Sequence, residues 1–258
     1  MNLEALIVRT ERGLMRKLPP SVALCSNAKL HWLFGEPELH ELSKLVRPGT
    51  LAIDIGAHFG TYSRTLAKLV GKRGQVISIE PIEEDARMLE RAARQLHLPI
   101  EVVHCALSSE NGFAEMYVPS IHGYEKTALS SLEPGEPRAD SRRVATKRLD
   151  DVLAGNTLPV SFIKIDVEGH EIDVLQGGLE TLRTHKSAIL IEINNDLGHR
   201  PVEAVFDLIV AQGYRGEFLE SGKYRRPLSA FDVTKHQISA ADNVLSKDYV
   251  NNFIFMPL

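Results

Sequence analysis

The chain has 258 residues, of which 43% are hydrophobic, 25% charged and 6% aromatic, and these values are typical of a globular protein with an ample core. Its formal net charge of −4 excludes the strongly basic footprint of nucleic-acid-binding proteins, so no nucleic-acid partner is expected. The two cysteines show no zinc or disulfide pattern, no apolar stretch is long enough for a membrane span, and no secretory signal pattern opens the chain, so a cytoplasmic location is expected.

Residues 1–48 mix apolar and charged positions without one strong period. Within them, Pro37–Val46 is predicted to form a short helix with Pro37 in its first turn. We interpret residues 1–48 as an N-terminal helical cap and residues 49–258 as the main domain.

From residue 51 onward, short apolar runs alternate with helical patterns. The runs predict strands at Leu51–Ile55, Gln75–Glu80, Ile100–Leu107, Val160–Asp166 and Ser187–Asn194. Helical spacing follows at Thr61–Val70 and in residues 81–97, 170–185 and 200–213. This alternation predicts βαβ units and a mainly parallel sheet with helices on both faces.

Further segments complete the expected fold. Gly112–Pro119 is predicted to be an extra strand in a side hairpin, and residues 214–220 and 251–257 to be two terminal strands. Residues 120–145 are polar and lack periodicity, and a loop of this length is usually functional or mobile. We expect it to be a lid or substrate loop, together with residues 1–40, or else a mobile surface loop. The candidate substrate contacts in it are Tyr124, Lys126, Ser130 and Ser131, with His122 as a candidate base.

Ligands bind at the carboxyl ends of the strands in such sheets. The residues predicted there, all acidic but one, are Asp54, Glu80, Leu107, Asp166 and Glu192. This concentration of carboxylates at one edge of the sheet predicts a binding site.

The first of these strands runs into a glycine loop, Asp54-x-Gly56-x-x-x-Gly60. It lacks the Gly-x-Gly start of dinucleotide-binding loops and the Gly-Lys-Ser/Thr of the P-loop. An acidic residue here suits a cationic ligand such as S-adenosylmethionine, which carries a sulfonium and an amino group. Glu80 can accept two ribose hydroxyls, but this applies to NAD as well as to S-adenosylmethionine.

Five segments together resemble the FkbM-type methyltransferases in order and spacing. They are "LAIDIGAHFGTYS", "GQVISIEP", "VVHCALSSENGFAEMYV", "FIKIDVEGHEIDVLQGG" and "ILIEI". The resemblance runs from about Leu45 to Asn194, and "KIDVEGHE" with the following "LQG" is its most specific part. The chain departs from the family pattern at His58, where Asn is usual, and at His170, where Ala is common.

This resemblance implies an α/β, Rossmann-like class I methyltransferase fold with a seven-stranded, mostly parallel sheet and an antiparallel last strand. It also implies transfer of a methyl group from S-adenosylmethionine to a hydroxyl of a sugar, glycan or specialised metabolite. Carried over, the methionine end would be held by Asp54, Gly56, Ala57, His58, Phe59 and Gly60. Glu80 would hold the ribose, and the adenine would be flanked by Pro81, Ile82, Ala106 and Leu107.

The "KIDVEGHE" block supplies the candidate catalytic residues. Methyl transfer requires an aligned hydroxyl and a group that removes its proton. We expect Asp166 to contact the amino group of the cofactor or the substrate hydroxyl. Glu168 is either a second carboxylate of the site or a helix cap, and His170 is either a base or a surface histidine. Glu171 is expected to offset the helix dipole.

Three alternatives remain at this stage. Asp166 and Glu192, with Asn194 or Asn195, form a possible set of oxygen ligands for a divalent cation, although metal dependence is not favoured. An NAD-dependent oxidoreductase or epimerase would require a G-x-G-x-x-G loop and a Tyr-x-x-x-Lys pair, which are missing. A non-catalytic binding module would be expected to have lost acids that this chain retains. The sequence leaves the oligomeric state open, a homodimer included.

Overall fold

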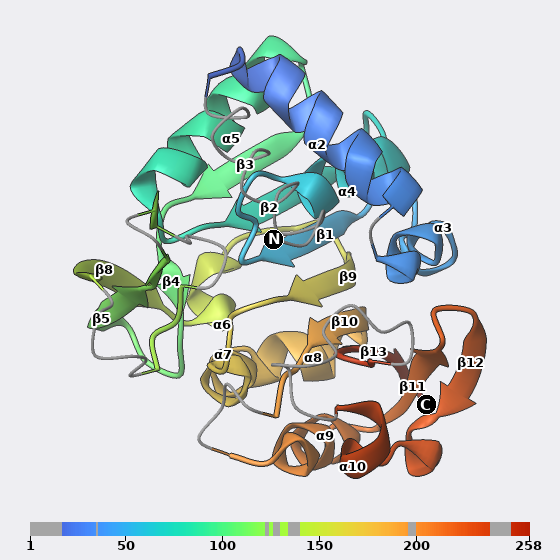
Figure 1. The fold of residues 1–258 in the computed structure, drawn as a ribbon. Helices are drawn as coiled ribbons and strands as arrows, with labels where there is room; N and C mark the ends of the chain where they lie inside the picture. Colours follow the sequence, from blue (N-terminus) through green and yellow to red (C-terminus); the bar gives the residue numbers. More distant parts are fainter. Residues whose placement is uncertain are drawn as a thin grey trace.

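The computed structural model describes residues 17–34, 36–121, 124–125, 130–133, 140–195, 200–237 and 249–258. A large sheet lies at its centre, with the strand order β12-β11-β13-β10-β9-β1-β2-β3 (Figure 1). Its parallel part consists of β1 (Leu51–Ile55), β2 (Gln75–Ile79), β3 (Ile100–Val103), β9 (Val160–Ile165) and β10 (Ala188–Glu192). These strands confirm the predicted parallel sheet.

The other edge of the sheet confirms the predicted antiparallel last strand. β13 (Asn252–Pro257) inserts between β10 and β11 (Tyr214–Glu220) and runs antiparallel to both. A short strand that was not predicted, β12 (Tyr224–Pro227), pairs with β11 and extends the sheet by one strand at this edge.

Helices cover both faces of the sheet, which explains why the residues of β1 are buried along the whole strand. On one face pack α6 (Leu149–Val152), α7 (Glu171–Gly177), α8 (Leu179–His185) and α9 (Val202–Val210). On the other face pack α4 (Thr61–Val70), η1 (Pro37–His40) and α3 (Leu42–Leu45). Alternate residues of β1 divide between the two faces, because Ile53 packs with the first group and Ala52 with the second.

α2 (Pro20–Phe34) is a helix for which the sequence gives no clear period. It packs against α4 and α5 (Glu83–Gln95), where Leu24 contacts the cluster that contains Ala57 and Leu89 (Figure 1). The single helix predicted at Pro37–Val46 is in fact two short ones, η1 and α3. The remaining short helices are η3 (Leu228–Ala230) and α10 (Val233–His236). Among the described residues, none of the helices combines the length and apolar character needed to cross a bilayer.

A second sheet corrects two predictions. The predicted strand Ile100–Leu107 ends at Val103, because the Cys105 N–H turns back to the Val103 carbonyl, and residues Ala106–Leu107 form β4 elsewhere. β4 joins β8 (Asp140–Lys147) and β5 (Gly112–Val118) in a three-stranded side sheet. Leu107 is therefore not at the carboxyl end of β3.

The predicted loop of residues 120–145 is only partly a loop. Its last residues belong to β8, which pairs with β5 from Asp140 to Thr146, and a small ladder forms between β6 (Ser120–Ile121) and β7 (Tyr124–Glu125). Its candidate base, His122, and one of its candidate substrate contacts, Lys126, lie outside the described residues.

Candidate functional site

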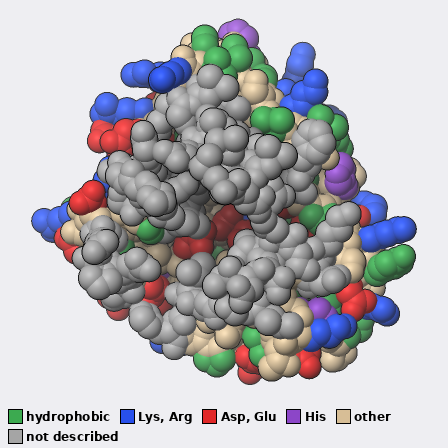
Figure 2. Space-filling model, in the orientation of Figure 1, with side chains coloured by type: hydrophobic (Ala, Val, Ile, Leu, Met, Phe, Trp, Pro, Cys, Tyr) green, Lys and Arg blue, Asp and Glu red, His purple; other side chains and the backbone are tan. Residues whose placement is uncertain are grey.

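A cavity of about 310 Å³ lies at the carboxyl ends of β1, β2 and β9. All of the predicted cofactor-binding and catalytic residues line it except Gly60 and Ile82. Figure 2 shows acidic side chains in the hollow at the centre of the face that Figure 1 presents. Of the acidic strand ends that the sequence predicts to meet at one edge of the sheet, Asp54, Glu80 and Asp166 line this cavity.

The loop after β1 depends on Gly56. Its φ of +77° is in the left-handed region, and a Cβ atom there would lie 1.8 Å from the Asp166 carbonyl oxygen. The Asp166 N–H in turn donates to the carbonyl of Ile55, at 3.0 Å. Only glycine therefore allows the loop after β1 to lie directly against the end of β9.

Gly60 and Asp54 fix the ends of this loop. Gly60, with φ of +77°, precedes α4, and a Cβ atom on it would lie 2.4 Å from Leu89 Cδ1, so its part is to pack the helix start. The Asp54 carboxylate accepts a hydrogen bond from the Ser63 hydroxyl, which also bonds Ser78 at 2.8 Å. Burial raises the pKa of Asp54 to about 6.

Glu80 lies at the end of β2 and holds the loop by its backbone. One carboxylate oxygen accepts the N–H of His58 at 2.7 Å and the other accepts the N–H of Ile82 at 2.8 Å. Burial raises the pKa of Glu80 to about 8. Each carboxylate oxygen has a second acceptor site, so the group is still able to accept hydroxyl hydrogen bonds from a ligand.

His58 has a backbone φ of +44°, which is unusual for a residue other than glycine. Its ring stands edge-on to Phe59, with the centroids 4.0 Å apart, and its Nε2 lies 3.6 Å from Asp85 Oδ2 on α5. The imidazole thus lines the cavity while it contacts a buried carboxylate of α5.

Pro81, Ala106 and Leu107 form an apolar part of the wall together with Met116 and Leu132. Ile82 lies beneath them, in a buried cluster with Ala106 and Met116. The residues that the resemblance assigns to the adenine are thus close together, although they come from two different sheets.

Lys164 is a part of the site that the sequence prediction missed. Its Nζ is buried, 3.6 Å from Asp166 Oδ2 and 4.0 Å from Glu192 Oε2, and lies over the ring of Tyr62 at 5.1 Å. It also donates to Asn252 Oδ1, at 3.4 Å. Burial lowers the pKa of this ammonium, but the carboxylates of Asp166 and Glu192 outweigh that effect and raise its pKa above the usual range.

The carboxylate and amide set predicted as metal ligands is therefore organised around an ammonium group. The Lys164 cation lies between Asp166 and Glu192. The Asn194 side chain donates to Glu192 Oε1 at 3.3 Å and accepts from the Tyr249 hydroxyl at 2.9 Å. Burial raises the pKa of Glu192 well above its usual value.

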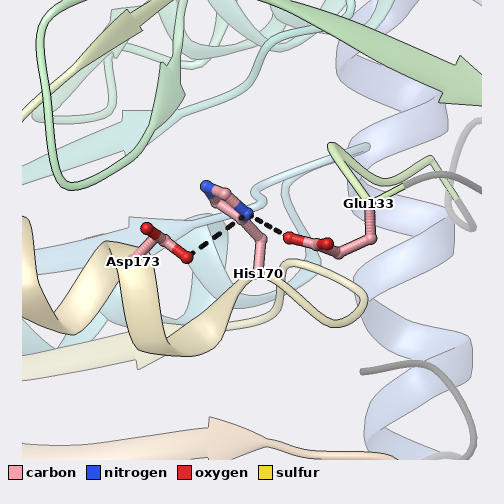
Figure 3. A group of neighbouring side chains, drawn as sticks. All are labelled: Glu133, His170 and Asp173. Atoms are coloured by element: carbon pink, nitrogen blue, oxygen red, sulfur yellow. Dashed lines mark hydrogen bonds and ion pairs between the residues drawn. The ribbon is translucent and has the colours of Figure 1, made fainter. Parts of the chain in front are cut away.

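A different group of possible metal ligands consists of Glu133, His170 and Asp173 (Figure 3). In the described parts of the chain it is the one group of three or more His, Cys, Asp or Glu whose ligand atoms lie within 4.8 Å of one another. His170 Nδ1 lies 2.7 Å from Glu133 Oε1 and 4.0 Å from Asp173 Oδ2. Its other ring nitrogen lies 3.0 Å from the hydroxyl of Ser108.

These contacts revise the interpretation of the "KIDVEGHE" block. The side chain of His170 is 12% exposed, so it is not a surface histidine. The carboxylate that accepts a backbone N–H at the start of α7 is that of Glu171, from Gly169 at 2.8 Å, and burial raises the pKa of Glu171 to about 7. Glu171 thus holds the loop that precedes α7, and the N-cap position, His170, has no side-chain cap from Glu168 or from Glu171. The Glu168 side chain lines the cavity, and its carbonyl accepts from Ser131.

Another wall comes from the N-terminal part of the chain, which was expected to contribute to the lid although none of the three residues that line the cavity was named. Asn27 and His31 of α2 line it, one helical turn apart, together with Glu36. Asn27 donates to the Thr61 hydroxyl at 2.7 Å, and the Tyr62 hydroxyl donates to Glu36. The spacing of Asn27 and His31 is the one signal in the sequence that places both on one helical face.

The comparisons with known proteins find methyltransferases. A family model described as "Methyltransferase FkbM domain" matches residues 54–215. The 2-O-methyltransferase NoeI of Sinorhizobium fredii is 28% identical over 197 residues, which are 68% of this chain and 79% of that protein. Ribosomal RNA large subunit methyltransferase E of Chromobacterium violaceum is 35% identical over 48 residues, but these are only 19% of this chain and 23% of that protein.

Among solved structures, the methyltransferase FkbM of Methylobacillus flagellatus KT superposes with a TM-score of 0.51 and 17% sequence identity. The match covers 97% of this chain and 60% of that one, so this chain spans about three-fifths of that protein. At this identity the likeness shows the fold.

Proposed function

Because this chain belongs to the FkbM family of methyltransferases, we propose that it is an S-adenosylmethionine-dependent O-methyltransferase that acts on a hydroxyl of a sugar, glycan or specialised metabolite. The observation that carries the proposal is the acidic cavity at the ends of β1, β2 and β9, which combines the Gly56 loop with Glu80 and Asp166. The name of its relative NoeI, a 2-O-methyltransferase, supports oxygen as the atom that is methylated.

The residues of the cavity fit S-adenosylmethionine as the methyl donor. Glu80 has acceptor sites for ribose hydroxyls, and Gly56 lets the backbone approach a ligand closely. The carboxylates of Asp54 and Asp166 suit the sulfonium and ammonium charges of this molecule. When bound, it supplies an electrophilic methyl group. The cavity volume of about 310 Å³ lies within the range of small-molecule sites.

Asp166 is the residue that we assign to the acceptor hydroxyl. Its side chain is 31% exposed and reaches the cavity, so a substrate can contact it. The Asp166 carboxylate lies 3.6 Å from the Lys164 ammonium, which holds it in place to accept a hydrogen bond from the hydroxyl and align it. His170 is a weaker candidate because Glu133 and Ser108 contact its two ring nitrogens. Glu168, which lines the same cavity as Asp166, supplies a second carboxylate.

The polar wall formed by α2 and Glu36 suits an acceptor with several hydroxyl groups. Asn27, His31 and Glu36 offer both donors and acceptors along one side of the cavity. We propose that these residues, which lie within the predicted cap of residues 1–48, contact the acceptor. No metal ion is assigned to this role, because Asp166 and Glu192 already face the Lys164 ammonium.

Calorimetric titration with S-adenosylmethionine, S-adenosylhomocysteine and NAD tests the donor. We expect binding of the first two at micromolar concentrations, and binding of NAD without either would refute the proposal. Incubation with S-adenosylmethionine deuterated at the methyl group, with a panel of sugars and cell extracts as acceptors, then identifies the product by mass spectrometry. The Asp166→Asn variant is expected to lose product formation even at concentrations of S-adenosylmethionine that saturate it.

A further inference from the structure

Residues 130–133, which we call the strap, lie between the side sheet and the loop that joins β9 to α7. Ser131 exchanges two backbone hydrogen bonds with Tyr117 of β5, at 2.8 and 3.1 Å. On the other side, the Ser131 hydroxyl donates to the carbonyl of Glu168, and Glu133 contacts His170 at 2.7 Å. The strap is thus attached on both sides, and Ser130 and Leu132 line the cavity between these attachments.

Ser130 differs from its neighbour in how its hydroxyl is used. Ser130 is only 9% exposed, its Oγ is shielded from solvent, and this atom has no hydrogen-bond partner among the residues that the structure describes. The hydroxyl of Ser131, by contrast, donates to the Glu168 carbonyl and accepts the N–H of Glu133, at 3.0 Å. A buried hydroxyl without a hydrogen-bond partner lowers the stability of the fold. Such a hydroxyl in the wall of a cavity therefore indicates a ligand that forms the missing hydrogen bond.

The surroundings of Ser130 indicate which part of a ligand would reach it. Leu132, two residues along the strap, packs against the cluster that contains Ile82, Ala106 and Met116. This end of the cavity therefore offers apolar surfaces and a thioether, which pack well against an aromatic ring. The carboxylates of Asp54 and Asp166 belong to the strand ends of β1 and β9, where they suit the charged end of the donor.

We propose that the Ser130 hydroxyl hydrogen-bonds the adenine base of bound S-adenosylmethionine, with the strap as one wall of the base pocket. A serine hydroxyl both donates and accepts, as the polar edge of adenine requires. The inference rests on the proposed function. It goes beyond the residues at the strand ends, because the strap belongs to the segment that connects β5 to β8. Ser130 is a binding residue in this scheme and takes no part in proton removal.

The test compares three probes with Ser130→Ala and the wild type by calorimetry. S-adenosylhomocysteine carries the whole scaffold, 5′-methylthioadenosine keeps the base without the amino acid, and S-ribosylhomocysteine lacks the base. For the first two probes, we expect Ser130→Ala to weaken binding by the same factor, about three- to tenfold, as for one uncharged hydrogen bond. For S-ribosylhomocysteine we expect equal affinity in the two proteins. An equal loss with that probe, or unchanged affinity for both nucleosides, would overturn the inference.

Ser131→Ala is the matched control for the free protein. The thermal midpoint of unliganded Ser130→Ala should equal that of the wild type or exceed it, whereas Ser131→Ala should lower it because two hydrogen bonds are lost. A midpoint of Ser130→Ala as low as that of Ser131→Ala would overturn the inference, since the hydroxyl would then serve the fold. If the wild type itself binds no S-adenosylhomocysteine, the proposed function fails together with the inference. If the wild type binds it and Ser130→Ala binds it equally well, only the assignment of Ser130 fails.

Discussion

Replacement of Lys164 by methionine tests the electrostatic design of the site. Methionine retains the length of the buried chain but removes the cation that lies 3.6 Å from Asp166 and 4.0 Å from Glu192. Removing one partner of a buried ion pair costs about 3–5 kcal/mol of unfolding free energy. Asp166 is 31% exposed and Glu192 17%, so solvent moderates the loss, and we expect a value near the lower end, about 3 kcal/mol at pH 8.

The loss should depend on pH because the two carboxylates remain. Without the ammonium, the repulsion between the two carboxylates is relieved when one of them binds a proton. Burial already raises the pKa of Glu192. A carboxyl whose pKa is raised in the folded state binds more protons there than in the unfolded state, so stability falls as the pH rises. The difference between variant and wild type grows over the pH range in which the folded variant holds a proton that the folded wild type has released, by up to about 1.4 kcal/mol per pH unit for one proton.

Urea denaturation at pH 5.5 and pH 8.0 measures both effects, with Lys44→Met as the control. Lys44 is 66% exposed and pairs with Glu41 at 2.8 Å, so its replacement should cost less than about 1 kcal/mol at either pH. A loss for Lys164→Met that is the same at both pH values, or no larger than that for Lys44→Met, would refute this account of the site.

Three further predictions concern the donor loop and the metal question. Above pH 8, where Glu80 is ionised, Glu80→Gln should weaken S-adenosylhomocysteine binding by about ten- to a hundredfold, as for lost charged hydrogen bonds. Since the Glu80 pKa is raised to about 8, the same variant should also show a smaller fall in stability between pH 5 and 8, measured by denaturation. Gly56→Ala should abolish binding or folding, seen by calorimetry and circular dichroism, because its Cβ would lie 1.8 Å from the Asp166 carbonyl oxygen. Methyl transfer should survive dialysis against EDTA, and activity that returns only with added divalent ions would contradict the role given to Lys164.

Much of the site is predictable because it follows from local patterns. The runs that form β1, β2 and β9 are apolar and end in acids, and parallel strands bring those ends together. Gly56 was recognised by its place after a strand, although its contact with Asp166 depends on the folded structure. Glu80 likewise follows from its place at the end of a strand.

Other features depend on contacts between distant segments. Lys164 looks like an anomaly within an apolar run, and its partner Asn252 lies 88 residues further along the chain. α2 was hard to predict because its outer face carries exposed apolar side chains, Val22, Trp32 and Leu33 among them, which obscure the buried stripe that includes Leu24.

The break between β3 and β4 is not marked in the sequence by a glycine or a proline. It arises because β8, which is 40 residues further on, pairs with Ala106 and Leu107 through Thr146 and Lys147. His170 was assigned to the surface by one interpretation because its partner Glu133 comes from the strap. These features are set by tertiary pairing, which periodicity does not report.

The side sheet also has a consequence for how this enzyme family can diversify. Its base is closed by the Ser108 N–H, which donates to the Lys147 carbonyl at 2.9 Å. This base packs on the main domain at Gly177 of α7, where a Cβ atom would lie 2.2 Å from the Ser108 carbonyl oxygen. β5 and β8 then run outward as far as the Val118–Asp140 pair. Beyond that pair, each doubling of the connecting length costs only about 0.6 kcal/mol. Insertions and deletions on either side of the strap, in residues 119–129 and 134–139, can therefore occur while the main sheet and the strap stay intact, and relatives should differ most in length there.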